Sequence, residues 1–380
     1  MKRNSLIGLA IVAAVVIVLA SLAVRQRTFE TKPSAGGGLM YGELLGKVNS
    51  VASIRVNNGS EIFTISRGAQ GWGIAEKSHY PVKYDLVKKT IMGVAELDLV
   101  GAKTKDPSRH GALGLNAPEA EEGGSVGLVL LDDNGETLAS LLVGRTERAG
   151  GARRYVRRPD ENQTWLSSGG IDPDRKPLDW TDMILTQIRH DRIRKVEFMH
   201  PDGDHAVLER MDQSGFDFTY LGIPEGMRAV TPTELNPVAG ALAFLNMKDV
   251  RPTNELDFGP TKASTAKFET WDGIVITIST IDVDDNKWAR FDVQFDESLV
   301  VENTPPADLS VDESDEEAEE VEDPHATLRE EAVTIRARTE GWAYALDDNK
   351  MEQLRRRNEN LIEPNTPDEE DESGDLNTNQ

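Results

Sequence analysis

The sequence predicts an α+β fold, in which an N-terminal transmembrane helix precedes two tandem repeats, each a mostly antiparallel sheet with one long helix. Three observations predict it: a long apolar run near the N-terminus, an order of strands and one helix that occurs twice, and glycine-containing turns between alternating apolar residues. The predicted regions are an anchor at 1–27, a stalk at 28–48, a first unit at 49–190, a second unit at 191–362 with an acidic disordered insertion at 302–328, and an acidic disordered tail at 363–380.

The anchor is the uncharged run from Ser5 to Val24, which is flanked by basic residues on both sides. Twenty apolar residues are enough to cross a bilayer as a helix. A cleaved signal peptide is the alternative, because Ser21 and Ala23 are small residues of the kind that precede a cleavage site. The apolar stretch is longer than the about 7–15 residues of a signal-peptide core, which favours an uncleaved anchor. Since a very short N-terminal side usually stays in the cytoplasm, we expect a single-pass protein with its large part in a periplasm-like space.

The formal net charge of −24 is concentrated in two segments. Residues 308–323 contain ten carboxylates and residues 363–380 contain seven, and neither segment has a lysine or arginine. Without these seventeen carboxylates the rest of the chain carries only −7, so we expect the two segments to be solvated and disordered and the folded part to be mildly acidic. Such a surface argues against nucleic acid as a partner. The absence of cysteine excludes disulfides, thiol nucleophiles and thiolate metal sites.

The repeat begins with two short strands joined by a polar turn and followed by an aromatic residue. Gly59 precedes Trp72 by thirteen positions in the first copy, and Gly203 precedes Phe216 by the same number in the second. A proline then opens a predicted helix in each copy, because the first turn of a helix needs no amide hydrogen there. The prolines and the apolar positions at +3, +6, +10 and +13 after them are Pro81, Tyr84, Val87, Ile91 and Val94, and Pro232, Leu235, Val238, Leu242 and Leu245.

Further strands are predicted after each helix. In the first copy, Asn134-Gly135 lies between two apolar runs, which is typical of a β-hairpin. In the second copy, Asp272-Gly273 has the same place. The predicted strands are 126–131, 137–143, 154–156 and 165–167 in the first unit, and 267–270, 274–281, 288–295, 333–338 and 342–346 in the second.

Several short motifs resemble one bacterial family. They are Gly71-Trp72-Gly73-Ile74, Tyr80-Pro81-Val82, Gly114-Leu115-Asn116-Ala117-Pro118, Val143-Gly144, Tyr155-Val156 and Trp180. With these residues the chain resembles the family known as domain of unknown function 4340, over about Val51 to Pro364. The resemblance implies an N-terminal membrane segment, a place in the bacterial inner membrane and association with transport systems of the ABC class. It implies no catalytic residues.

The sequence contains no motif that predicts an enzyme, a metal site or a cofactor site. The chain has no G-x-S-x-G, P-loop or H-E-x-x-H sequence. The segment His200–His205 holds two imidazoles and two carboxylates, but its Pro-Asp-Gly centre is typical of a turn. The segment Asp282–Asn286 resembles the opening of a calcium loop, but Lys287 replaces the required glycine and Val293 the bidentate glutamate.

Arginines supply the one candidate interaction patch. It consists of Arg145, Arg148, Arg153, Arg154, Arg157 and Arg158, around a predicted hairpin tip. One interpretation is an edge strand that its charges keep unpaired. The other is docking to an acidic partner, to lipid phosphates or to residues 308–323 of the same chain. A second basic run, Arg355–Arg357, is predicted to form the solvated face of a closing helix.

These observations favour a membrane-tethered, non-enzymatic accessory or scaffold protein on the extracytoplasmic side. We expect protein partners in a membrane complex, and the resemblance implies a complex of the ABC type. One alternative is a ligand-binding module with a pocket between the two units, since domain junctions often form pockets. Another is an envelope hydrolase whose active site is assembled from distant loops.

Overall fold

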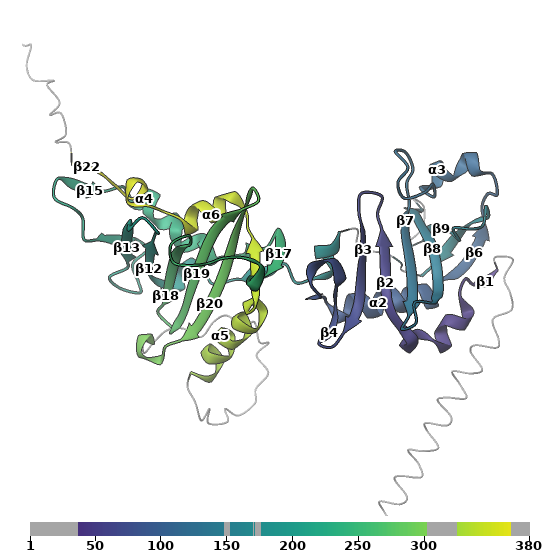
Figure 1. Cartoon of the computed structure of the whole chain (residues 1–380), viewed down its shortest axis with the longest axis horizontal. Coiled ribbons are helices and arrows are strands. Elements are labelled where there is room, and N and C mark those ends of the chain that lie inside the picture. Colours follow the sequence, from purple (N-terminus) through teal and green to yellow (C-terminus); the bar gives the residue numbers. More distant parts are fainter. Residues whose placement is uncertain (1–36, 148–152, 170, 172–175, 302–324, 366–380) are drawn as a thin grey trace, which may run out of the picture. The chain divides into compact units, whose positions relative to one another are not determined.

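The computed structural model describes residues 37–147, 153–169, 171, 176–301 and 325–365 (Figure 1). The chain divides into two compact units between Thr181 and Asp182. The predicted anchor, Arg148, residues 302–324 of the acidic insertion and residues 366–380 of the acidic tail lie outside the described residues. Among the described residues, no helix is long and apolar enough to span a membrane.

The first unit is built on a ten-stranded antiparallel sheet with the spatial order β1-β6-β10-β9-β8-β7-β2-β3-β4-β5. Its strands are β1 (Gly38–Leu39), β2 (Val51–Asn57), β3 (Ile62–Gly68), β4 (Gly71–Ile74), β5 (Tyr80–Pro81), β6 (Asp98–Ala102), β7 (Val126–Asp132), β8 (Thr137–Thr146), β9 (Arg154–Arg157) and β10 (Thr164–Ser168). Asn134-Gly135 lies in the turn between β7 and β8, so this predicted hairpin is confirmed.

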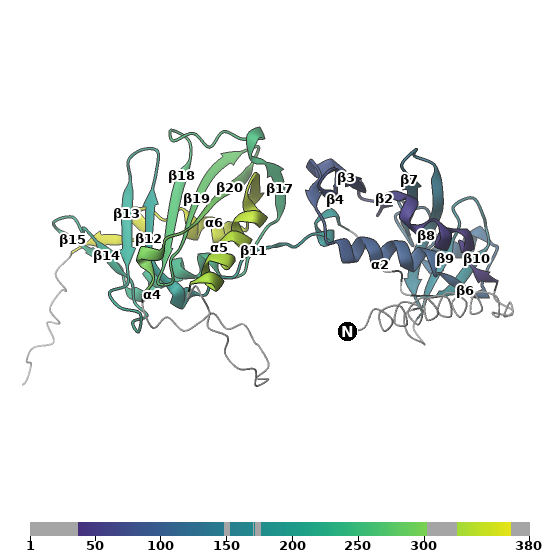
Figure 2. The same cartoon turned by 90° about the horizontal axis from the view of Figure 1, so that it is seen from below.

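Helix α2 (Tyr84–Ala95) covers the core side of this sheet (Figure 2). Val87, Ile91 and Val94, three of the four predicted apolar positions, are buried in the core with strand residues. Tyr84, the fourth, is 62% exposed. The other α-helix described in this unit is the single turn α3 (His110–Leu113).

Part of the predicted stalk belongs to this core. β1 pairs with β6, and the 3₁₀ helix η1 (Gly42–Gly46) follows it. Met40 is 3% exposed and Leu44 is 2% exposed. The folded unit therefore begins before the expected boundary at residue 49. Burial of Met40 and Leu44 removes apolar surface from water and so stabilises the attachment of this segment to the core.

The second unit is built on an eight-stranded antiparallel sheet with the order β14-β13-β12-β18-β19-β20-β21-β17. Its strands are β12 (Ile193–Met199), β13 (His205–Glu209), β14 (Thr219–Leu221), β17 (Asp249–Pro252), β18 (Ser264–Thr270), β19 (Ile274–Val283), β20 (Asn286–Phe295) and β21 (Trp342–Ala345). Two small sheets pair β11 (Ile184–Thr186) with β16 (Leu245–Asn246), and β15 (Met227–Ala229) with β22 (Ile362–Pro364). Glu363, the first residue of the predicted tail, thus lies in a paired strand.

The two sheets share an internal strand order. In the first unit β3, β2, β7 and β8 are neighbours in that order, and in the second unit β13, β12, β18 and β19 are. In each case a strand hairpin comes first along the chain, and a later hairpin pairs against its first strand.

The predicted α+β fold class with one long helix in each repeat is wrong. The described chain is mostly sheet, and its five α-helices are short. In the second unit, Pro232 begins only the single turn α4 (Pro232–Leu235), which continues as the 3₁₀ helix η7 (Asn236–Leu242). Pro237 lacks the amide hydrogen that a continuous α-helix would need there, and Gly240 further disfavours the helix.

The burial of these residues follows the predicted pattern although the helix does not form. Leu235, Val238, Leu242 and Leu245 are all buried, and Leu245 lies in β16. The apolar spacing therefore identified core residues, while the backbone geometry was set by proline and glycine.

A strand was also predicted where a helix occurs. Residues 333–338 lie within α5 (Ala326–Thr339), which packs along β20 (Figure 1). The β-branched residues of this stretch are typical of a strand. The buried residues Ala332, Ile335 and Thr339, however, are spaced three and four apart, as on one face of a helix.

Candidate functional site

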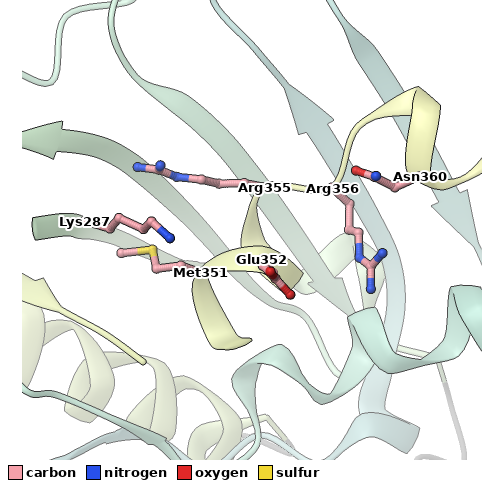
Figure 3. A pocket seen from close by; sticks show the side chains of 6 residues that line it. All are labelled: Lys287, Met351, Glu352, Arg355, Arg356 and Asn360. Carbon is pink, nitrogen blue, oxygen red and sulfur yellow. The ribbon is translucent and has the colours of Figure 1, made fainter. Parts of the chain in front are cut away.

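A basic pocket of about 320 Å³ lies in the second unit (Figure 3). Helix α6 (Asp348–Leu354), β20, the segment after α6 and the 3₁₀ helix η10 (Asn358–Asn360) provide its walls. The lining residues are Lys287, Met351, Glu352, Arg355, Arg356 and Asn360.

The sequence around α6 fixes the position of the arginines. The Asp347 carboxylate caps the helix by accepting a hydrogen bond from the amide of Asn349 at 3.1 Å. Met351 and Leu354 are buried and hold the helix against the unit. Because α6 ends at Leu354, the three arginines follow it directly. The prediction that they form a solvated helix face is therefore wrong.

Arg355 is held by strand β19. Its Nε donates a 2.8 Å hydrogen bond to the Thr280 hydroxyl, and its Nη1 lies 2.8 Å from each carboxylate oxygen of Asp282. Its Nη2 is buried and has no hydrogen-bond partner among the described residues. One end of this guanidinium is thus anchored, and the other end keeps unused donors.

Arg357 is held by the turn between β12 and β13. Its Nη1 lies 2.8 Å from an oxygen of Asp202 and 3.3 Å from an oxygen of Asp204. The hydrogen bond from Arg357 lowers the pKa of Asp202. In the same turn, His200 Nε2 donates to the carbonyl oxygen of Arg356 at 3.0 Å, which fixes the backbone between the two outer arginines.

Carboxylates of the two segments that resemble metal sites, His200–His205 and Asp282–Asn286, therefore form ion pairs with the arginines. Asp202, Asp204 and Asp282 have arginine partners, and His205 lies 2.8 Å from Glu197. The residues that the structure describes include no group of three or more side chains placed to hold a metal ion. The turn Asp284-Asp285 joins β19 to β20 with positive φ angles of 51° and 61°, as a two-residue hairpin loop requires.

Arg356, the middle arginine, lines the pocket without a carboxylate partner. None of its guanidinium nitrogens has an ion pair within the described part of the chain, and its Nε is buried without a hydrogen bond. Lys287 is paired with Asp348 at 3.1 Å, but the side chains are 42% and 82% exposed, so this pair is weak. Glu352 is the one acidic residue in the lining. The pocket therefore offers the cationic side chains of Arg356 and Lys287 and one carboxylate.

The described arginines of the predicted interaction patch in the first unit contact backbone carbonyls and carboxylates of their own unit. Arg157 makes the most of these contacts. Arg157 is 9% exposed, and its guanidinium donates to the carbonyl oxygens of Arg158, Pro159, Glu161 and Leu115 at 2.9–3.3 Å. Burial lowers the pKa of Arg157. Its contacts join the loop after β9 to the turn after α3, which is a structural role.

The other described arginines of the patch also contact their own unit. Arg158 donates to the carbonyl of Met40 at 2.6 Å, and Arg154 to that of Gly144 at 3.3 Å. Arg153 lies 3.9 Å from Glu147. Arg145 donates to the carbonyl of Ala112 at 3.4 Å. Docking of a partner at this patch stays a prediction.

Replacing Arg157 by lysine is expected to lower the free energy of unfolding of the first unit by about 2 kcal/mol, because a lysine keeps the charge but cannot reach all four carbonyls. Amide hydrogen exchange of β9 and β10 measures the change. Arg145→Lys is the matched control and should stay within about 0.5 kcal/mol, since the hydrogen bond of Arg145 to a described residue is long, at 3.4 Å. Equal effects of the two substitutions would contradict the structural role of Arg157.

Comparison with known proteins gives one family match. The model of the family described as Domain of unknown function (DUF4340) matches residues 72–270. The match begins within β4 and ends with β18, so it includes parts of both units, and the residues that line the basic pocket lie beyond it. Neither a curated protein nor a solved structure matches the chain. The match covers more than half of the sequence and confirms the predicted resemblance, and the chain belongs to the DUF4340 family.

Proposed function

We propose that this protein is a membrane-tethered, non-enzymatic accessory protein that binds protein partners at the extracytoplasmic face of the inner membrane. The apolar run from Ser5 to Val24 supports tethering. The resemblance described above makes a transport complex of the ABC class the partner that we would test first. The observation that carries the binding role is a group of exposed apolar residues in β14 and the loops beside it.

We define the β14 edge surface as four exposed apolar residues in β14 and its two flanking loops. They are Met211, Phe216, Leu221 and Ile223, which are 77%, 69%, 38% and 41% exposed. β14 is the last strand of the eight-stranded sheet, so one side of its backbone has no strand beside it in the described part of the unit. Edge strands with exposed apolar neighbours are ready sites for pairing with another chain. In a chain with so many charged residues, this grouping supports a protein-binding role.

Acidic residues in the same stretch of sequence indicate the character of the partner. Asp212, Asp217 and Glu225 lie in the same segment, between β13 and β15. A partner segment that combines apolar side chains with basic ones would complement both features. Pairing along β14 would supply backbone hydrogen bonds, and the apolar side chains would supply buried area.

A photo-crosslinking amino acid at position 216 of the full-length membrane form is expected to give a defined protein adduct. The same amino acid at position 62 is the control, because Ile62 is likewise exposed, at 58%, but lies on β3 of the first unit. Mass spectrometry identifies the adduct. Phe216→Asp combined with Leu221→Asp should reduce recovery of that partner after mild detergent extraction by about tenfold. No adduct at position 216, or equal adducts at both positions, would reject the proposed surface.

A further inference from the structure

We propose that the basic pocket of the second unit binds a small phosphate-bearing ligand. This inference goes beyond the proposed accessory function, because it concerns a different surface from the β14 edge. It rests on three observations: the distribution of carboxylates among the three arginines, the cationic side chains that line the pocket, and the size of the hollow.

The carboxylates near the pocket leave the middle arginine unneutralised. Asp282 holds Arg355 and Asp202 holds Arg357, and both pairs have nitrogen–oxygen distances of 2.8 Å. Arg356 lies between them, and its carbonyl is fixed by His200. The backbone at Arg356 is therefore fixed in position before any anion binds, which lowers part of the entropic cost of binding.

The cationic side chains of the lining supply the donors that a ligand can reach. Nη2 of Arg355 and Nε of Arg356 are both buried and lack hydrogen-bond partners within the described residues. These two atoms are closed off from the pocket, so the donors open to a ligand are the remaining nitrogens of Arg356 and the ammonium of Lys287, whose side chain is 42% exposed. The Nζ of Lys287 and the side-chain amide of Asn360 belong to the same lining (Figure 3).

The number and type of these donors favour phosphate. A guanidinium matches two oxygens of a phosphate group, and a lysine adds a point charge. Arg355 and Arg356 extend in opposite directions (Figure 3), so Arg356 is the arginine assigned to the phosphate. The volume of about 320 Å³ lies at the low end for ligand pockets, so it suits a small phosphate ester. Glu352 opposes anion binding and limits the affinity.

Isothermal titration calorimetry of the purified full-length chain tests the inference. The probes are inorganic phosphate, glycerol 3-phosphate and soluble dihexanoyl phosphatidic acid at millimolar concentrations. We expect at least one of them to bind, with an affinity that falls as salt is added. Equal binding of the two esters would indicate a free phosphate ester as the natural ligand, and clearly tighter binding of the phosphatidic acid would indicate a lipid headgroup.

Three variants decide whether the binding occurs in this pocket. Arg356→Gln should weaken it about tenfold or more. Glu352→Gln should strengthen it several-fold, a gain that a damaged fold would not produce. Arg228→Gln is the matched control, because Arg228 is an exposed arginine of the same unit that pairs with Glu363. The inference is overturned if no probe binds, or if Arg356→Gln and Arg228→Gln have the same effect. Either result leaves the crosslinking test of the β14 edge surface unaffected.

Discussion

Arg192→Met is expected to lower the free energy of unfolding of the second unit by about 3–5 kcal/mol. Arg192 Nε lies 2.6 Å from Asp272, and its two Nη atoms lie 2.9 and 2.8 Å from the carboxylate oxygens of Glu331. The side chain of Asp272 is 3% exposed and that of Arg192 is 13% exposed. Removing the guanidinium would leave a buried carboxylate without its counter-charge.

The direction of the pKa shift of Arg192 agrees with this account. Burial alone would lower the pKa of Arg192, but hydrogen bonds and charges from Glu331 and Asp272 outweigh it, and the pKa is raised. These contacts also join three parts of the chain that are far apart in sequence, since Arg192 precedes β12, Asp272 follows β18 and Glu331 lies on α5. The loss is therefore expected throughout the unit.

Urea denaturation followed by amide exchange of β12 and α5 measures the effect. Arg189→Met is the matched control, because Arg189 pairs with Asp191 while its side chain is 64% exposed. An exposed pair of this kind contributes about 0–1 kcal/mol. If both substitutions cost the same, the buried pair would not stabilise the unit in the way described.

Local sequence patterns predicted the hairpins of both units. Asn134-Gly135 and Asp272-Gly273 each lie between strands that pair in the structure. In both cases the turn and its flanking strands are within about ten residues of one another, so turn chemistry and period-two burial are sufficient. The same holds for the buried face of α2, whose Val87, Ile91 and Val94 follow the helical period.

Longer-range features could not be predicted in this way. The wall of the basic pocket depends on contacts between Arg355 and Asp282 and between Arg357 and Asp202, which are 73 and 155 residues apart. The periodicity of apolar residues along the chain does not predict which charged residues so far apart will pair. A sequence signal did exist, since a triple arginine run and two acidic turns occur in one repeat unit, but their pairing became evident only with the register of β19 and the position of α6.

Gly144→Ala is expected to lower the free energy of unfolding of the first unit by about 3 kcal/mol, the upper end of the range for overpacking. Gly144 lies in β8, where a Cβ atom would be 2.4 Å from the carbonyl oxygen of Leu113 and 3.0 Å from that of Gly114. These oxygens belong to the backbone at the end of α3, so they cannot turn away as a flexible side chain would. The strand or the α3 turn must then move.

Gly127→Ala is the control for this substitution. Gly127 lies in the neighbouring strand β7, where a Cβ atom would have its nearest neighbours at 3.5 Å or more, an ordinary contact distance. This change should stay within about 0.5 kcal/mol, because an alanine in a strand loses less backbone entropy on folding than a glycine does. Thermal and urea unfolding of the two variants gives the comparison. If Gly144→Ala is as stable as Gly127→Ala, the close approach of β8 to α3 is wrong, and with it the physical reason for glycine at this position.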